Sequence, residues 1–291
     1  MEIKTVGILG SGQMGRGTAY VAAFAGYKVL FYNHRLSTLE EKALPYIEKE
    51  LTKGIERGKN TEEDKQRTLA NLHITDKLED LAEADFIIES LPEVLEIKQA
   101  TYAELDKICP EHTIFASNTT SLSITELASV TDRPDRFIGM HFFNPVHKMK
   151  LIEMVNGLET SPETTKTTKE LGISFGKEVI TVKESPGFVT SRIQAIIGNE
   201  AFIMLNEGLA TAEDIDKACK IGLNHPMGPF EMIDFVGLDT RLKSLEYLSK
   251  MLGDKYKPAP LHVQYVKAGR LGKKVGKGVY DYDENGKKIE K

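Results

Sequence analysis

Val6-Gly7-Ile8-Leu9-Gly10-Ser11-Gly12-Gln13-Met14-Gly15-Arg16-Gly17 is the stretch that carries the strongest fold signal in this sequence. Gly10, Gly12 and Gly15 have the spacing G-x-G-x-x-G, which is a weak signal when it stands alone. The residues around it strengthen the signal. The apolar positions within 3–9 predict a buried strand, and the small apolar run at 18–26 (TAYVAAFAG) predicts a helix packed closely on a sheet.

A second strand is predicted at 29–32 (VLFY), so the order is strand, glycine turn, helix, strand. This βαβ unit binds dinucleotides. Its first glycine permits a tight turn, its second lets the backbone approach a pyrophosphate, and its third lets helix and strand touch. The helix N-terminus then faces the phosphates. The expected cofactor contacts here are Gly10, Gly12, Gln13, Met14 and Gly15; the alternative is a glycine-rich turn without a ligand.

The composition is that of an ordinary globular protein, with 41% hydrophobic and 28% charged residues among 291. A net charge of -5 and a pI near 5.9 are not those of a basic protein, so nucleic acid is not an expected partner. No apolar run reaches the roughly 18 residues of a membrane span, and no signal peptide is expected. Cys109 and Cys219 are predicted to be buried free thiols in a reducing cytoplasm, and no metal site is expected.

A charged helical pattern extends from 37 to 72 and predicts two antiparallel helices inserted between strands. Beyond it, predicted strands alternate with helices as far as residue 182. We therefore predict an α/β fold, a Rossmann-type doubly wound sheet over 1–184. A boundary follows in the sequence KESPG, and residues 185–291 are predicted to form a smaller all-helical domain. One of its helices is expected at 229–253, and its apolar first helix suggests a homodimer.

Polar side chains occur where predicted strands end, which is where ligands bind in open α/β sheets. Ser117 and Asn118 stand at the end of one predicted strand, and His141 with Asn144 at the end of the next. Glu153 lies on the strand after that, and pairing of the two strands would bring it beside the imidazole. A carboxylate there would fix the histidine tautomer while the other ring nitrogen exchanges a proton with a substrate. Taken singly, His141 and Glu153 are also compatible with structural or surface roles.

Several further motifs occur in order along the whole chain: GSGQMG, ESLPE with Lys98, SNTTSLSI, GMHFFNPV, KLIEMV, SPGF, HPMGPFE and GKKVGKGVY. Together they resemble the 3-hydroxyacyl-CoA dehydrogenase family. The resemblance implies NAD(P)-linked interconversion of (S)-3-hydroxyacyl-CoA and 3-oxoacyl-CoA. It implies His141 as general acid/base, Glu153 as its orienting partner, and Ser117 as a hydrogen-bond partner of the substrate's C3 oxygen. It further implies that Glu93, Lys98, Asn144 and Lys274 line the cofactor site.

The resemblance also implies that the helical pair at 37–72 reaches the CoA moiety, which makes Lys53 and Lys59 candidates for phosphate contacts. One departure from the family pattern is Ser191, which stands where many members have an asparagine that donates to the substrate's C3 oxygen. A hydroxyl can donate one hydrogen bond but reaches less far. Ser191 is therefore a candidate substrate-binding residue, and its role is left open.

The second departure is Asn33, followed by His34 and Arg35, where NAD-specific members have Asp. That Asp would accept hydrogen bonds from ribose hydroxyls and would repel a 2′-phosphate. An amide and a guanidinium can instead bind the phosphate. The sequence therefore favours NADP, with NAD as the alternative.

Two other functions remain open from the sequence. One is a dehydrogenase of a free hydroxy acid, such as a relative of L-gulonate 3-dehydrogenase, which would need no CoA contacts. The other is a non-catalytic NAD(P)H-binding protein, which would need no intact His141–Glu153 pair.

Overall fold

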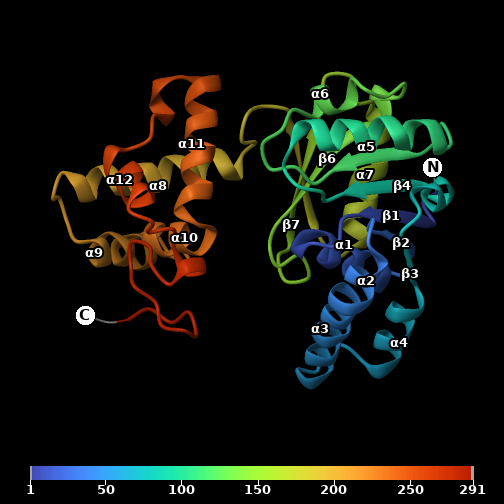
Figure 1. Cartoon of the computed structure of the whole chain (residues 1–291), viewed down its shortest axis with the longest axis horizontal. Helices are drawn as coiled ribbons and strands as arrows, with labels where there is room; N and C mark the ends of the chain where they lie inside the picture. Colours follow the sequence, from blue (N-terminus) through green and yellow to red (C-terminus); the bar gives the residue numbers. More distant parts are fainter. Residues whose placement is uncertain (1, 290–291) are drawn as a thin grey trace. The chain divides into compact units, whose positions relative to one another are not determined.

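The computed structural model describes residues 2–289, and its chain divides into two compact units, Met1–Phe188 and Val189–Lys291. The first unit is a sheet with helices on both faces, and the second is built from helices, so the predicted fold class is confirmed (Figure 1). The assignment of cofactor binding to 1–184 and of substrate binding and dimerisation to 185–291 stays a prediction.

One eight-stranded sheet has the strand order β3-β2-β1-β4-β5-β6-β7-β8. Its strands are β1 (Thr5–Leu9), β2 (Lys28–Tyr32), β3 (Leu72–Thr75), β4 (Phe86–Glu89), β5 (Ile114–Ser117), β6 (Phe137–Phe142), β7 (Leu151–Asn156) and β8 (Glu178–Lys183). All neighbours are parallel except β6 and β7. The connection from β6 to β7 is too short for the crossover that a parallel pair needs, so the chain reverses direction there.

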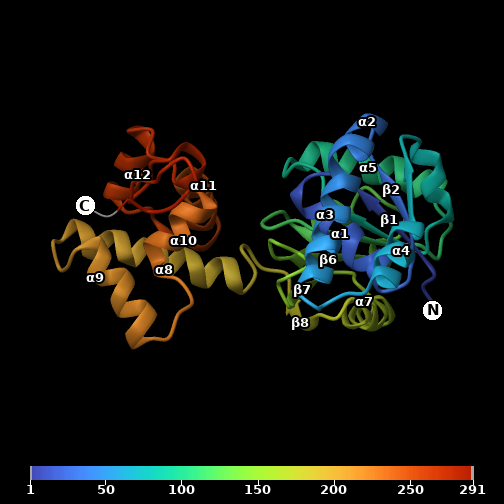
Figure 2. The same cartoon turned by 90° about the horizontal axis from the view of Figure 1, so that it is seen from below.

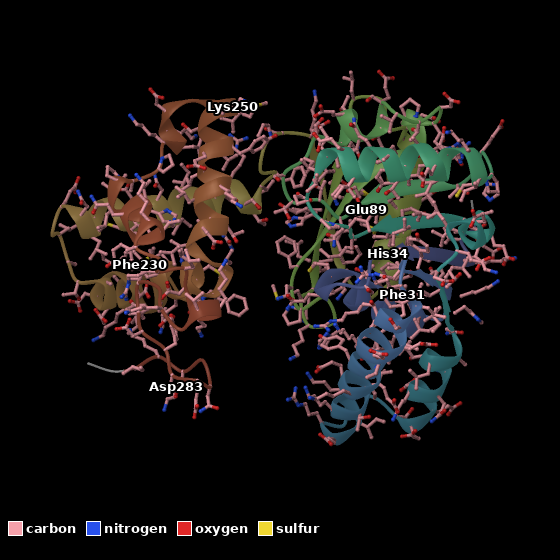
Figure 3. All side chains as sticks on the ribbon, in the orientation of Figure 1. Phe31, His34, Glu89, Phe230, Lys250 and Asp283 are labelled. Carbon is pink, nitrogen blue, oxygen red and sulfur yellow. The ribbon has the colours of Figure 1, made fainter. Side chains whose placement is uncertain are left out.

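Two helical layers cover the sheet. One face packs against α1 (Gln13–Phe24) and α7 (Pro162–Ser174), and α3 (Leu44–Glu56) packs on α1. The other face packs against α5 (Leu95–Ile108) and α6 (Ile124–Ala128). Shorter elements are α2 (Leu36–Thr38), α4 (Glu62–Ala70), the π-turn η1 (Leu39–Ala43) and the 3-10 turns η2 (Leu78–Glu83) and η3 (Pro134–Arg136). Figure 3 labels Phe31 of β2, which is fully buried in the first layer.

Helices α3 and α4 pack against each other and form the pair expected between 37 and 72 (Figure 1). The second of them begins at a capping box, in which Thr61 accepts a hydrogen bond from the Asp64 N–H and the Asp64 carboxylate accepts one from the Thr61 N–H. Two helix-start donors are satisfied in this way, so the boundary of α4 follows from local sequence alone.

The C-terminal unit packs its helices around α8 (Thr190–Asn206), as Figures 1 and 2 show. The others are α9 (Ala212–Lys217), α10 (Pro229–Val236), α11 (Leu238–Leu252) and α12 (Pro260–Lys267), with the π-turn η4 (Ala218–Gly222) and the 3-10 turns η5 (Asp254–Tyr256) and η6 (Lys273–Val275). The single helix expected at 229–253 was wrong. Gly237, at φ 107°, ends α10 because a positive φ cannot continue a right-handed helix.

The glycine-rich tail of this unit is held by one buried carboxylate. Asp234 of α10 accepts hydrogen bonds from the Val279 and Tyr280 N–H groups and from the Tyr282 hydroxyl, at 2.8–2.9 Å. A Cβ at Gly278 would lie 2.0 Å from the carboxylate oxygen, so this position needs glycine.

Candidate active site

The glycine turn after β1 leaves no room for side chains at two of its three glycines. A Cβ on Gly10, at φ 92°, would lie 2.6 Å from the Ser90 carbonyl oxygen. A Cβ on Gly15 would lie 1.7 Å from the Gly10 carbonyl oxygen. These contacts bring the start of α1 against the ends of β1 and β4, and only glycine permits them.

The third glycine, Gly12, is different, because a Cβ there would meet nothing within 4 Å. It is the N-cap of α1, and neither a side-chain cap nor an acidic residue in the first turn satisfies the helix-start N–H groups, which include those of Gln13 and Met14. An open space in front of uncapped N–H groups fits a dinucleotide pyrophosphate. Helix-start N–H groups and the helix dipole would both favour the anion.

Asn33 connects the end of β2 with the glycine turn. Its amide nitrogen donates to the Ser11 hydroxyl at 2.7 Å, and its carbonyl oxygen accepts from the Arg35 N–H at 2.9 Å. His34 and Arg35 are exposed. The position that directly follows β2 is thus occupied by an amide rather than a carboxylate.

Strand register places four ionisable or polar side chains on one face of the sheet, the face that α5 and α6 cover. Glu89 is paired with Ser117 across β4 and β5, and His141 is paired with Glu153 across β6 and β7. Side chains alternate between faces along a strand, and the neighbours Ile87, Phe115, Phe137 and Val155, two or four residues away, all lie in the core beneath α5 and α6.

His141 and Glu153 form a buried pair. The Nδ1 atom of His141 lies 2.8 Å from Oε2 of Glu153, and the two residues are 7% and 0% exposed. Because the carboxylate only accepts, this bond assigns the proton to Nδ1 in the neutral ring and leaves Nε2 for another partner. The rings of Phe143 and Phe188 flank the imidazole at centroid distances of 4.6 and 5.9 Å.

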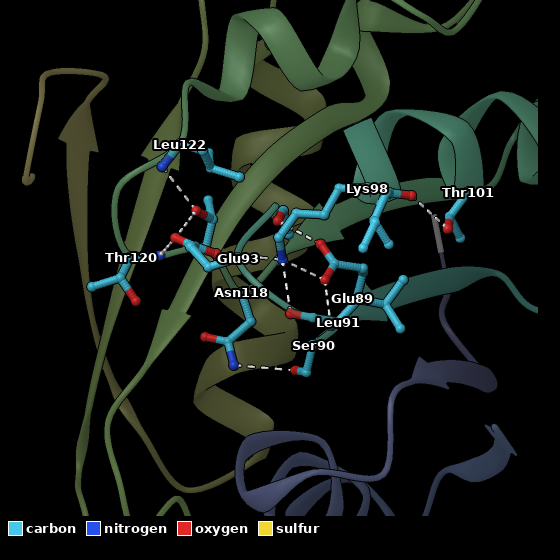
Figure 4. Close-up of polar contacts among 12 residues, drawn as sticks. Glu89, Ser90, Leu91, Glu93, Lys98, Thr101, Asn118, Thr120 and Leu122 are labelled. Atoms are coloured by element: carbon cyan, nitrogen blue, oxygen red, sulfur yellow. Dashed lines mark hydrogen bonds and ion pairs between the residues drawn. The ribbon is translucent and has the colours of Figure 1, made fainter. Parts of the chain in front are cut away.

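Glu89 joins several neighbours that sequence inspection treated separately (Figure 4). Its carboxylate accepts from Lys98 Nζ at 2.5 Å and from the Ser117 hydroxyl at 2.7 Å, and Lys98 and Glu89 have no exposed side-chain surface. A buried ion pair is tolerated only when further hydrogen bonds satisfy it. Here the Leu91 N–H supplies one more, and the Tyr102 hydroxyl lies 3.4 Å away.

Tyr102 is fully buried, and this burial, with the nearby charge of Glu89, holds the pKa of its phenol well above the usual value. The hydroxyl therefore stays protonated and donates to the Ala116 carbonyl at 3.0 Å. The Glu89 carboxylate thus holds the Ser117 hydroxyl, and Tyr102 holds the backbone carbonyl of the residue before Ser117.

Glu93 stabilises the loop that follows Ser117. One of its oxygens accepts from the Thr119 hydroxyl, the Thr120 N–H and the Ser121 N–H at 2.6–3.0 Å, and the other lies 3.5 Å from Lys98 Nζ (Figure 4). Both predicted residues, Glu93 and Lys98, therefore order the loop and the strand end beside Ser117.

Asn118 ties three strand ends together. Its amide donates to the Ser90 hydroxyl at 3.2 Å, and its carbonyl accepts from the Phe142 N–H at 2.9 Å.

The loop after His141 is also held by Lys177, whose ammonium donates to the Val146 carbonyl and, at 2.8 Å, to the Met149 carbonyl. Burial lowers the pKa of Lys177 to about 8. Asn144 lies half-buried in this loop.

The remaining predicted residues lie elsewhere. Lys53 is on α3 and pairs with Glu50 at 2.6 Å, and Lys59 is exposed in the turn before α4. Ser191 and Lys274 belong to the C-terminal unit, where Ser191 is in the first turn of α8 and Lys274 pairs with Asp239.

Lys53 and Lys59 line a cleft of about 710 Å³ within the N-terminal unit. Its cationic side chains come from α3, from the turn after it, from the β6–β7 loop and from the end of α7: Lys53, Arg57, Lys59, Lys148, Lys150 and Lys177. Glu50 is the one carboxylate among its described lining residues, so the cleft has an excess of positive charge suited to an anion.

Sequence reasoning missed Glu89 and Tyr102, and it placed Asn118 in the polar cluster after Ser117 without giving it a role. Glu89 carried a usable signal, because a carboxylate that ends an otherwise apolar strand (FIIE) needs an ion-pair or hydrogen-bond partner once it is buried. Tyr102 carried none, because a tyrosine on a helix is common. Cys109 is buried as expected, whereas Cys219 is only half-buried.

Family comparisons agree with this geometry. The model described as 3-hydroxyacyl-CoA dehydrogenase, NAD binding domain, matches residues 5–185, and the C-terminal domain of the same family matches residues 187–282. The chain belongs to the 3-hydroxyacyl-CoA dehydrogenase family. It is accordingly an NAD-dependent oxidoreductase of 3-hydroxyacyl-CoA.

Relatives match along nearly their whole length. A probable 3-hydroxybutyryl-CoA dehydrogenase of Bacillus subtilis is 47% identical over 98% of this chain and 99% of its own. The human mitochondrial hydroxyacyl-coenzyme A dehydrogenase is 36% identical over 96% of this chain and 91% of its own. The crystal structure of (S)-3-hydroxybutyryl-CoA dehydrogenase from Ralstonia eutropha superposes with a TM-score of 0.95 at 44% identity, over 97% of this chain and 100% of that one.

Within residues 2–289, no three His, Cys, Asp or Glu side chains gather in a way that could hold a metal ion. In the same range, no helix has both the length and the apolar character needed to cross a bilayer.

The contrast between Gly12 and Gly15 gives a test of the cofactor site. Gly12→Ala should fold normally, because its Cβ has space, yet weaken dinucleotide binding by about tenfold or more, because the methyl group would occupy the phosphate approach. Gly15→Ala should unfold at a lower temperature even without cofactor, because its Cβ would overlap the Gly10 carbonyl. Thermal unfolding and calorimetric titration measure both effects. Wild-type affinity in Gly12→Ala would contradict the proposed site.

Proposed function

We propose that this protein interconverts (S)-3-hydroxybutyryl-CoA and acetoacetyl-CoA, with His141 as the general acid/base. The buried His141–Glu153 pair, on a sheet that also carries a dinucleotide-type glycine turn, is the observation that carries the proposal. The choice of a C4 acyl group is supported by relatives at 43–47% identity that are named as 3-hydroxybutyryl-CoA dehydrogenases or probable ones.

The proton is handled by Nε2 of His141. When bound, the nicotinamide supplies the hydride in ketone reduction or accepts it in alcohol oxidation. Removal of a hydride from a carbinol carbon requires the hydroxyl proton to leave to a base, and the free Nε2 can take it. Glu153 then stabilises the imidazolium, because its carboxylate already holds Nδ1–H.

Ser117 is the proposed partner of the C3 oxygen. Its one hydroxyl proton is donated to Glu89, so Ser117 can offer lone pairs to the substrate's hydroxyl group and help to orient it. Asn144 and Ser191 are further candidates for substrate or nicotinamide contacts, and Glu93, Lys98 and Lys274 for the cofactor site.

The cationic cleft beside α3 is the proposed CoA site. CoA carries three phosphate groups, and the cleft presents lysine and arginine side chains from four segments around one carboxylate. Lys53 and Lys59 are the proposed phosphate contacts. A free hydroxy acid would have no use for these charges, which disfavours the gulonate-type alternative.

We propose that the enzyme prefers NADP, although the family model is that of an NAD-binding domain. The amide of Asn33 is oriented by Ser11 and by the Arg35 N–H, and the Arg35 side chain is exposed beside it. A neutral donor next to a guanidinium suits a 2′-phosphate, whereas Asp at this position would repel it.

The protein is further proposed to act in the cytoplasm as a homodimer formed through the C-terminal unit. Exposed apolar side chains on α8 and α10, Ile193 at 54% and Phe235 at 51%, support an interface between copies.

Initial rates test the function. Acetoacetyl-CoA should be reduced faster than free acetoacetate, and L-gulonate should not be oxidised. Each substrate is assayed in parallel with NADP(H) and with NAD(H). Equal rates with acetoacetate and its CoA ester would favour the free-acid enzyme. No turnover of any substrate would favour a non-catalytic binding protein.

Replacement of the catalytic pair should separate chemistry from binding. His141→Gln should lower kcat by roughly 10²–10⁴, the usual contribution of a positioned acid/base, and Glu153→Gln should lower it as well, because the imidazolium loses its counter-charge. Dinucleotide affinity should survive in both variants. His73→Gln, a change at an exposed histidine of β3, is the control. Near-normal turnover of His141→Gln would remove the mechanism.

Charge reversal in the cleft should affect substrate binding rather than turnover. Lys53→Glu with Lys59→Glu should raise KM for acetoacetyl-CoA and leave kcat nearly unchanged, because these contacts bind ground and transition states alike. The effect should shrink at high salt, which screens exposed charges. Lys166→Glu with Lys169→Glu makes the same charge change at exposed positions of α7. An equal rise of KM in this control would count against a local CoA site.

Cofactor choice is measured by the ratio of kcat/KM with NADPH to that with NADH. The ratio should exceed one in the natural protein and fall by roughly ten- to a hundredfold in Asn33→Asp with Arg35→Thr, since charged hydrogen bonds are lost and a repulsion is added. A natural preference for NADH, or an unchanged ratio in the double variant, would show that Asn33 and Arg35 do not select NADP.

A further inference from the structure

Arg241 of α11 is a buried cation without a counter-charge. Only 6% of the residue is exposed. Its Nη2 atom donates to the Gln194 carbonyl oxygen at 2.8 Å, whereas its Nε–H is fully buried and has no hydrogen-bond partner. No carboxylate within residues 2–289 forms an ion pair with it. The guanidinium is therefore held by one neutral amide.

Such a placement is costly, because a buried charge is normally paired and hydrogen-bonded. Burial alone lowers the pKa of Arg241, with no acidic neighbour to offset it. The same uncompensated charge reaches a neighbouring side chain. The pKa of His262 is lowered by its own burial and further by the positive charge of Arg241, although its bond to the Leu238 carbonyl opposes this.

The guanidinium borders a cavity of about 190 Å³ that lies within the C-terminal unit. Gln194 and Arg241 line it with polar groups, and Ile197, Met227, Met232 and Ile233 supply apolar walls. An anion with an apolar stem would satisfy both kinds of lining. Phosphate would have to lose its water against the apolar walls without enough donors to replace it.

We propose that this cavity is a binding site for a short-chain carboxylate, with Arg241 as the residue that binds the anion. A planar carboxylate matches the guanidinium fork, whose charge no described carboxylate compensates. The carboxylate is a free short-chain acid, and its binding does not depend on the proposed acyl-CoA function.

Thermal unfolding of the full-length protein tests the site. Sodium butyrate and sodium adipate should raise the Tm of the natural protein above its value in sodium chloride and sodium phosphate of equal ionic strength, because a ligand of the folded state stabilises it. Arg241→Met should abolish this rise. Lys243→Met, which removes an exposed charge from the same helix, should retain it.

The chloride buffer also separates binding from a structural role. Without a carboxylate, Arg241→Met should unfold at no lower temperature than the natural protein, since replacing an uncompensated buried charge by an apolar side chain of similar size is neutral or stabilising. The proposal is overturned if carboxylates give no specific rise of Tm, if the rise persists in Arg241→Met, or if that variant is strongly destabilised in chloride.

Kinetics separate the cavity from the active site. Because the proposed ligand is a free acid, Arg241→Met should leave KM for acetoacetyl-CoA unchanged while it abolishes the thermal effect. A rise of this KM by about tenfold or more would overturn the site by indicating a general structural defect. Absence of acetoacetyl-CoA turnover in the natural protein would overturn the proposed function and leave the thermal result intact.

Discussion

The ion pair between Glu89 and Lys98 is the interaction on which the ends of the central strands depend. Neither side chain is exposed, so each charge must be satisfied from within the protein. The carboxylate collects donors from α5, from the backbone after β4 and from Ser117 at the end of β5. A helix and two neighbouring strands are thereby held in one arrangement, and the hydroxyl of Ser117 is oriented by a group that no short-range pattern associates with it.

The reversal of the chain between β6 and β7 has a comparable consequence. A short connection can only produce an antiparallel neighbour, and antiparallel pairing places His141 directly opposite Glu153. The close approach of the paired side chains then yields the buried hydrogen bond. The loop responsible for the reversal is held by Lys177 and by the bond from Phe142 to Asn118, so the carboxyl end of β6 has a defined course toward Asn144.

The two units use buried charges differently. In the C-terminal unit, Asp216 and Asp234 each accept three hydrogen bonds, which connect α10 with the tyrosines of the tail. Their carboxylates are therefore satisfied within the fold. Arg241, a short distance along the chain, is not satisfied in this way and borders a cavity instead. The difference separates charges that hold the structure together from a charge that is available to a ligand.

The sequence by itself determined the fold class, the glycine turn, the start of α4 and the residues of the His141–Glu153 pair. These depend on local spacing, on apolar periodicity and on the alternation of side chains along strands, which a single chain already contains. The roles of the site residues remain predictions. Only the tertiary structure decided that Glu89 joins Lys98 to Ser117, that Glu93 braces the loop at 119–121 and that helix 229–253 breaks at Gly237. Those features arise from contacts between segments far apart in sequence or from a backbone angle, and no local pattern encodes which distant donor a buried carboxylate will find.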